Sequence, residues 1–220
     1  MVNMYNTDCM EFMKSVPDKF YELAIVDPPY GIERFKRGSL IFDKENKYTN
    51  GLKWDCKPND KYFHELFRVS RYCIIWGMNN FTLPETEYFI VWDKKGAVDN
   101  FAQCELAWTN IRQPAKIFTY AWQGLSDGIV GRNKKEKSIH PTQKPVALYK
   151  WLLKNYAKPG DKILDTHGGS GSICIACHDM GFNLDWMELD EDYYKAAVER
   201  YQRHAAQGEL FDIAGGQIVE

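Results

Sequence analysis

The sequence predicts an α/β fold built around a mostly parallel sheet. Three short, mostly apolar runs at 23–26, 162–164 and 184–187 each lead into an acidic residue and are followed by a loop or a helical stretch. Such alternation is typical of buried parallel strands joined by crossover helices. The composition, 45% apolar and 26% charged, is that of an ordinary globular protein and agrees with a packed sheet.

Acidic residues end four of the predicted strands: Asp8, Asp27, Asp165 and Glu188. Because ligands bind beyond the carboxyl ends of parallel strands, we expect these four acids along one edge of the sheet, close to a ligand. The alternative for each acid is a role in a turn or as the N-cap of a helix.

Periodicity predicts the remaining elements. In chain order these are helices over 9–16 and 60–70, a buried strand over 72–76, an antiparallel pair over 88–92 and 104–108, and helices over 145–157, 172–180 and 190–206. The segments 31–58 and 111–141 carry little regular signal. Connections of that length inside a compact domain are usually functional or mobile.

The length of 220 residues fits one domain spanning 1–220. No run approaches the ~18 apolar residues of a membrane span, and the first residues lack the basic and apolar regions of a secretory signal. Six cysteines in such a chain are expected to be reduced thiols, which indicates a cytoplasmic protein. The histidines have no metal-ligand spacing, and the pair Cys174 and Cys177 lies in a predicted helix, so we predict core packing and no metal site.

Charge is unevenly distributed although the net value is only −2. Residues 32–58 hold seven Lys or Arg against four Asp or Glu, and residues 112–137 hold six against two. Two basic segments are compatible with a phosphate-backbone partner. Two solvated loops would give the same pattern, and charge alone favours that alternative.

The first chemically informative motif is Asp27-Pro28-Pro29-Tyr30, directly after an apolar strand. The prolines fix two φ angles and remove two backbone donors, so carbonyl acceptors remain without competing N–H groups. With the Asp27 carboxylate and the Tyr30 ring, they suit a planar substrate that carries an amino group. Stacking of a base on an aromatic ring is worth about 1–3 kcal/mol. A tight turn after a strand is the alternative.

The second motif is a glycine-rich loop, residues 165–171, between a predicted strand and a predicted helix. Glycines there let the backbone turn tightly and approach a ligand. Glu188 follows Gly171 by 17 residues, near the ~20-residue spacing at which an acid binds ribose hydroxyls. The pattern lacks the lysine of a P-loop and the serine spacing of a nucleophile elbow. It is therefore compatible with an adenosine-type cofactor.

The third motif is His140-Pro-Thr-Gln-Lys144-Pro145, at the start of a predicted helix. A helix N-terminus with a lysine nearby favours a carboxylate or another anion. Ordinary entry into a helix through a proline is the alternative.

Together, and in this order, the three motifs resemble those of the amino-methyltransferases that use S-adenosylmethionine to methylate exocyclic amino groups in DNA, in the beta-ordered subgroup. Residues 3–31 and 140–201 match the family pattern closely, whereas 31–139 match it loosely. The resemblance implies a circularly permuted Rossmann-like methyltransferase sheet, mostly parallel with an antiparallel strand and with helices on both faces. It also implies that 31–58 and 111–139 are inserted loops that contact DNA and recognise its sequence.

The resemblance further implies a role for individual residues. Asp27, Pro28, Pro29 and Tyr30 would hold the target amino group. The cofactor would be bound by Asp8 and Cys9 near its adenine, by Lys144 near its carboxylate, by Asp165, His167, Gly169, Ser170 and Gly171 around its methionine part, and by Glu188 at its ribose. The family loop usually has an aromatic residue where this chain has His167, and this position lines the cofactor pocket.

We expect methyl transfer to N6 of a flipped adenine in DNA, as in a restriction-modification enzyme or in a phage or orphan methylase. Cytosine N4 is the nearest alternative, because its amine is chemically similar. Methylation of RNA or of a protein amide is a second one, although an Asn in place of Asp27 would have favoured an amide. A non-catalytic module that binds the cofactor or DNA is a third.

The last residues, 207–220, are predicted to form a tail. Within it Gln207, Leu210 and Phe211 resemble the peptide that docks on bacterial DNA sliding clamps. Chance, or packing of the tail against the body, is the alternative.

Overall fold

The computed structural model describes residues 1–31, 56–95, 102–121, 139–140 and 142–215, with side chains described up to residue 207. Most of the two predicted DNA-contacting inserts, 31–58 and 111–139, lies outside the described residues. The described residues include the first two motifs completely and the third except for residue 141.

An eight-stranded sheet forms the middle layer of the described part of the chain, in the order β1-β8-β7-β2-β3-β5-β4-β6. Its strands are β1 (Val2–Asn6), β2 (Tyr21–Val26), β3 (Ser70–Trp76), β4 (Phe89–Asp93), β5 (Cys104–Thr109), β6 (Lys116–Thr119), β7 (Lys162–Asp165) and β8 (Asn183–Glu188). Only β5 runs antiparallel to its neighbours among these strands. The predicted mostly parallel sheet is confirmed.

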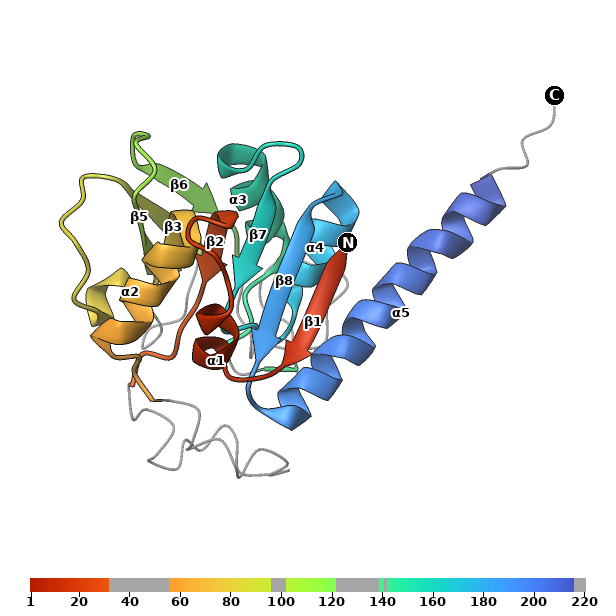
Figure 1. Cartoon of the computed structure of the whole chain (residues 1–220). Coiled ribbons are helices and arrows are strands. Elements are labelled where there is room, and N and C mark those ends of the chain that lie inside the picture. The colour runs from red at the N-terminus through yellow and green to blue at the C-terminus, as the bar shows by residue number, and fades with distance from the viewer. Residues whose placement is uncertain (32–55, 96–101, 122–138, 141, 216–220) are drawn as a thin grey trace, which may run out of the picture.

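Helices cover both faces of the sheet (Figure 1). They are α1 (Cys9–Lys14), α2 (Asp60–Val69), α3 (Val146–Tyr156), α4 (Ser172–Met180) and α5 (Glu191–Gly215), with a short 3₁₀ turn at Met78–Asn80. Alternation along β2 shows the two layers: Leu23 and Ile25 pack in one core with α3 and α4, whereas Ala24 and Val26 pack in the other with α1 and α2.

Two elements differ from expectation. β6 was not predicted, because its four residues lie at the sheet margin and are at most half-buried, so they carry no apolar run. The last helix, α5, continues to Gly215, beyond the predicted end at 206, and Figure 1 shows it projecting past β1 and away from the sheet. The backbone from Gln207 to Phe211 is therefore helical. Clamp docking through Gln207, Leu210 and Phe211 stays a prediction.

The topology brings the strand-end acids together. β1, β8, β7 and β2 are parallel neighbours, so Asp8, Asp27, Asp165 and Glu188 follow or end adjacent strands at one edge, as predicted. We call this the carboxyl edge. Because β5 runs the other way, its first residues reach the same edge.

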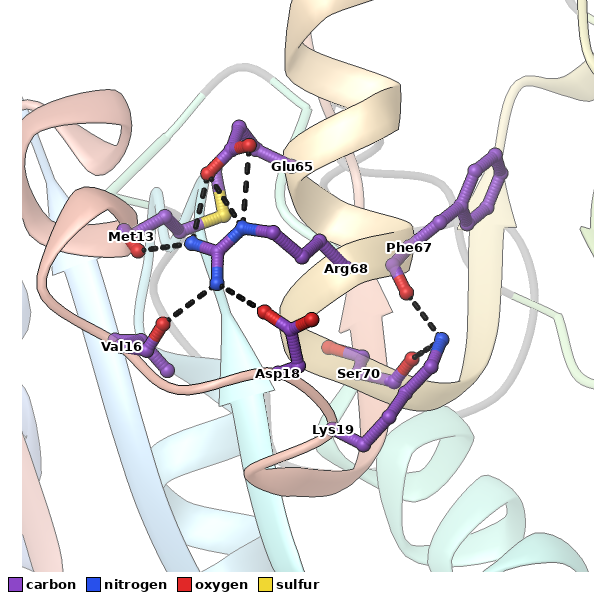
Figure 2. A network of polar contacts seen from close by, with 8 residues as sticks. All are labelled: Met13, Val16, Asp18, Lys19, Glu65, Phe67, Arg68 and Ser70. Carbon is purple, nitrogen blue, oxygen red and sulfur yellow. Dashed lines mark hydrogen bonds and ion pairs between the residues drawn. The ribbon is translucent and has the colours of Figure 1, made fainter.

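At the opposite edge of the sheet a group of charged side chains joins neighbouring segments (Figure 2). We call it the amino-edge cluster, and it consists of Arg68, Glu65, Asp18 and Lys19. The Arg68 guanidinium donates to Glu65, to Asp18 Oδ1 at 2.8 Å, and, at 2.7 Å each, to the carbonyls of Met13 in α1 and Val16 in the α1–β2 connection. Lys19 donates from Nζ to the carbonyls of Phe67 and Ser70. These bonds join the end of α2 to the segment before β2.

None of the helices in the described ranges combines the length and the apolar character needed to cross a bilayer.

Candidate active site

A cavity of about 860 Å³ opens at the carboxyl edge, within the size range of small-molecule sites. Most of the predicted site residues line this cavity. They are Asp8, Cys9, Asp27, Pro28, Pro29, Tyr30, Lys144, His167, Gly169, Ser170 and Glu188. Asp165 and Gly171 are not among its lining residues, and both are buried behind the loop. The Asp27 motif and the glycine loop therefore border a common space.

The Asp27 motif is fixed by its own tyrosine. Asp27 follows β2, whose last four residues are buried, and Tyr30 Oη donates to Asp27 Oδ1 at 2.6 Å. The Tyr30 ring lies against Gly77, which has φ +74°, and a Cβ on Gly77 would fall 2.2 Å from a ring carbon. Only glycine at the end of β3 leaves room for the ring.

Lys144 connects the third motif to Asp27. Its Nζ donates to Asp27 Oδ2 and lies 3.1 Å from Glu105 Oε2, while its carbonyl accepts a bond from Ser172 Oγ at 2.7 Å. Burial lowers the pKa of Lys144, but the two carboxylates raise it by more, so the net shift is upward and the side chain is charged. The predicted place for Lys144 was the cofactor's carboxylate. In the structure its ammonium is engaged by Asp27 and Glu105.

Glu105, the first acid of β5, was not predicted. Its Oε1 lies 2.5 Å from Lys94 Nζ, just after β4. Burial raises the pKa of Glu105, and Lys144 and Lys94 lower it by more, so the net shift is downward. Asp27, Lys144, Glu105 and Lys94 thus alternate in charge along the edge, and we call them the carboxyl-edge cluster. An acid at the start of a predicted antiparallel strand was the signal that could have found Glu105.

The glycine loop is shaped by close packing and by Glu188. A Cβ on Gly168 would fall 1.8 Å from the Trp186 ring, so the backbone lies directly on that side chain. Gly169, at φ +52°, donates its N–H to Glu188 Oε2 at 2.8 Å, and Asp190 N–H donates to Oε1 at 2.9 Å. Burial is the main cause of the raised pKa of Glu188.

Neutral polar groups lie beneath and beside the loop. Burial raises the pKa of Asp165 to about 8, and its Oδ1 accepts the His167 N–H at 3.1 Å. Burial lowers the pKa of His167 to about 4, so the imidazole is neutral near pH 7. Thr166 Oγ1 bonds both His167 Nδ1 at 3.0 Å and Tyr62 Oη at 2.7 Å. Tyr62, a cavity residue from α2, was not predicted.

Asp8 combines the two roles that the sequence left open. Its carboxylate caps α1 by accepting the N–H of Met10 at 2.7 Å, and it also lines the cavity. Burial raises the pKa of the neighbouring Cys9 thiol to about 12, so this cysteine is not a thiolate nucleophile.

The donors and the shape of the cavity fit S-adenosylmethionine. Acids stand at the ends of β1 and β8, a closely packed glycine backbone faces the space, and a neutral imidazole and a phenol give it a flat, weakly polar wall. These are features that an adenosine-bearing cofactor needs. Among the described residues, no group of three or more His, Cys, Asp or Glu side chains is placed to hold a metal ion.

The fold and the site together define an α/β enzyme with a cofactor loop and an amine-binding motif on one sheet edge. The chain belongs to the DNA methylase family of N6 and N4 methyltransferases, whose family pattern matches residues 57–199, well over half of its length. It is thus an S-adenosylmethionine-dependent DNA methyltransferase, and the predicted family is confirmed.

Two relatives match this chain in sequence over almost its whole length. The putative methylase YubD of Escherichia coli K12 is 27% identical, over 93% of this chain and 93% of its own. The type II methyltransferase M2.MboI of Moraxella bovis is 25% identical, over 90% and 87% respectively. The crystal structure of the M1.HpyAVI–SAM complex shares the fold, with 21% identity, a TM-score of 0.53, and coverage of 91% of this chain and 100% of that one.

Proposed function

We propose that this DNA methyltransferase acts on the exocyclic N6 amine of adenine. The observation that carries the proposal is the common cavity bordered by the Asp27-Pro28-Pro29-Tyr30 motif and the glycine loop. The two segments follow β2 and β7, which are hydrogen-bonded neighbours in the sheet. The pairing of these strands therefore fixes the distance between the starts of the two segments. The choice of adenine over cytosine rests on the Asp at position 27, as the family resemblance implies.

Asp27 is the acceptor for the target amine in this proposal. A carboxylate has about four lone-pair sites. Among the described residues, Tyr30 Oη and Lys144 Nζ bond Asp27, one on each oxygen, so each oxygen keeps room for an amine hydrogen. Bonds from the amine to Asp27 and to a carbonyl of Pro28 or Pro29 favour a tetrahedral nitrogen with a free lone pair.

The opposite wall holds the cofactor. Glu188 would bind the ribose hydroxyls, Gly169 and Ser170 would follow the methionine part, and His167 would pack along the pocket. Bound there, S-adenosylmethionine supplies an electrophilic methyl group on a sulfonium. The residues of the two walls contribute mainly alignment, and well-oriented groups gain about 7–11 kcal/mol from positioning. A general base is not required, because the proton can leave the nitrogen after transfer.

The base must leave the duplex to reach this cavity, at a cost of a few kcal/mol. The Tyr30 ring, packed on Gly77 and edge-on to Phe81 at 5.9 Å, offers a stacking surface that offsets part of this cost. Lys57, a cavity residue at the end of the basic segment 32–58, and the basic segment 112–137 supply positive charge for the phosphate backbone.

The test combines a product assay with one variant. Purified protein is incubated with unmethylated DNA and methyl-labelled cofactor, and the DNA is digested to nucleosides and separated. The proposal predicts N6-methyladenine, and less than about 1% of that amount from Asp27→Ala, a loss equivalent to about 2.7 kcal/mol. N4-methylcytosine would replace the adenine proposal, and near-normal turnover by the variant would remove Asp27 from the reaction.

A further inference from the structure

We propose that Glu105 is a positioning residue for the methyl transfer, acting through Lys144 on Asp27 and balancing the charge of the cavity wall. This inference rests on the proposed role of Asp27. It concerns an acid that belongs to none of the three motifs.

The Lys144 ammonium lies between two carboxylates: it donates a hydrogen bond to Asp27 and forms an ion pair with Glu105. Its ammonium contacts Asp27 Oδ2 on one side and Glu105 Oε2, 3.1 Å away, on the other. The two carboxylates come from the ends of different strands, β2 and β5, and the Lys144 side chain is only 4% exposed. A buried ammonium with one partner can rotate about it, whereas one held between two fixed carboxylates has a single position.

That position sets the plane of the Asp27 carboxylate. Tyr30 Oη donates to Oδ1 and Lys144 Nζ donates to Oδ2. A shift of the ammonium would therefore rotate the carboxylate and change the direction of the lone pairs that remain for the target amine. Small errors in alignment are costly in a reaction that depends on positioning. Glu105 therefore reaches the target amine indirectly, through two side chains.

Glu105 also balances charge. The carboxyl-edge cluster holds two lysines and two carboxylates and is neutral. Replacing Glu105 by Gln leaves Lys94 and Lys144 with Asp27 alone, which gives the wall a net charge of +1. S-adenosylmethionine carries a positive sulfonium, whereas its demethylated product, S-adenosylhomocysteine, has a neutral sulfur. An added positive charge beside the cavity weakens binding of the first more than of the second.

The test compares Glu105→Gln with Glu65→Gln, which removes the charge of a glutamate paired in the amino-edge cluster. We expect Glu105→Gln to lower kcat about 30-fold, equivalent to about 2 kcal/mol, with KM for DNA within about threefold of wild type. We expect calorimetry to show at least about a tenfold larger loss of affinity for S-adenosylmethionine than for S-adenosylhomocysteine, about 1.4 kcal/mol. Glu65→Gln should change neither kcat nor this ratio.

A charge-retaining variant guards against misfolding. Glu105→Asp should regain at least half of the lost cofactor discrimination, because the charge stays although the side chain is shorter. Equal loss of both cofactor forms in Glu105→Gln, or kcat within about threefold of wild type, would overturn the inference. If Asp27→Ala is inactive while Glu105→Gln is normal, only this inference fails. If Asp27→Ala is active, the proposed function fails with it.

Discussion

The two charged clusters of this protein lie at opposite edges of the same sheet, and they use their hydrogen bonds differently. Around Arg68, all five guanidinium N–H groups have acceptors, and Asp18 is 76% exposed to water. Around Lys144, the carboxylate of Asp27 is 15% exposed and keeps lone pairs that the described residues do not fill. The first cluster joins segments of the chain. The second presents an acceptor to a cavity.

This difference separates structural from functional ion pairs. Exposed salt bridges contribute little, about 0–1 kcal/mol, so the value of Arg68 comes largely from the two main-chain carbonyls it binds. Buried charges are expensive and persist only when they are well paired. In the carboxyl-edge cluster the buried charges include the Asp27 carboxylate, which is the acceptor that the proposed reaction needs at the cavity.

Among the variants that compare the two edges, loss of Lys144 has the largest expected effect. Lys144→Met removes the cation between Asp27 and Glu105, and breaking a buried pair costs about 3–5 kcal/mol. We also expect methyl transfer to fall by more than about 100-fold, or about 2.7 kcal/mol. Urea unfolding and labelled-methyl incorporation measure the two effects. A stable and active variant would mean that the cluster is not what holds Asp27.

Gly77 offers a matched pair of backbone variants. Gly77→Ala and Gly181→Ala both place alanine at positive φ, +74° and +73°, but only the first adds a methyl group that overlaps the Tyr30 ring. Both should lose about 1–2 kcal/mol of stability from the left-handed backbone, and Gly77→Ala should lose more because its methyl group overlaps the Tyr30 ring. Gly77→Ala should also lower kcat about tenfold, about 1.4 kcal/mol, because Tyr30 is displaced. Similar kcat values in the two variants would show that the packing of Tyr30 on Gly77 does not matter for methyl transfer.

At the amino edge, Arg68→Ala should affect stability alone. The variant loses charge-assisted bonds to the carbonyls of Met13 and Val16, and we expect the free energy of unfolding to fall by about 1–3 kcal/mol. Initial rates of methyl transfer, measured well below the unfolding temperature, should stay at the wild-type level. A specific loss of kcat would erase the functional distinction between the two edges.

A different kind of effect is expected at Asp165, where the free energy of unfolding depends on pH. Its pKa is about 8 in the folded protein, against an ordinary value of 3.8. Between these values the folded protein binds the extra proton, so the stabilisation is complete at low pH and is lost as pH rises from about 4 to 8. The stability difference between wild type and Asp165→Asn should therefore shrink by about 1 kcal/mol per pH unit. Urea titrations at several pH values measure it, and parallel curves would contradict it.

Glu65 at the amino edge should behave in the opposite way. The bond from Arg68 lowers the pKa of Glu65 below its ordinary value, so its contribution is present at neutral pH and is lost as pH falls through the acid range. Urea titrations of Glu65→Gln at the same pH values provide the control, and the stability difference from wild type should shrink as pH falls.

Local patterns were sufficient to predict the sheet except for β6, and most of the cavity wall. Helix α4 has the predicted bounds, because the glycine loop and Gly181 delimit it. Asp27 and the glycine loop were placed together because parallel strands share one edge. Tyr62 was missed because it reaches the cavity only through the packing of α2, whereas Glu105 carried a signal, its place at the start of a predicted antiparallel strand, that was not used. The partners of Lys144 were beyond sequence reasoning because they meet it only through the tertiary arrangement.

The most direct test of the account is a single-turnover measurement of methyl transfer by Asp27→Ala, with cofactor and DNA both saturating. The account predicts a rate at least about 1,000-fold below wild type, about 4 kcal/mol, with the affinity for S-adenosylmethionine unchanged within about threefold. A single-turnover rate close to that of wild type would contradict the claim that Asp27 holds the target amine.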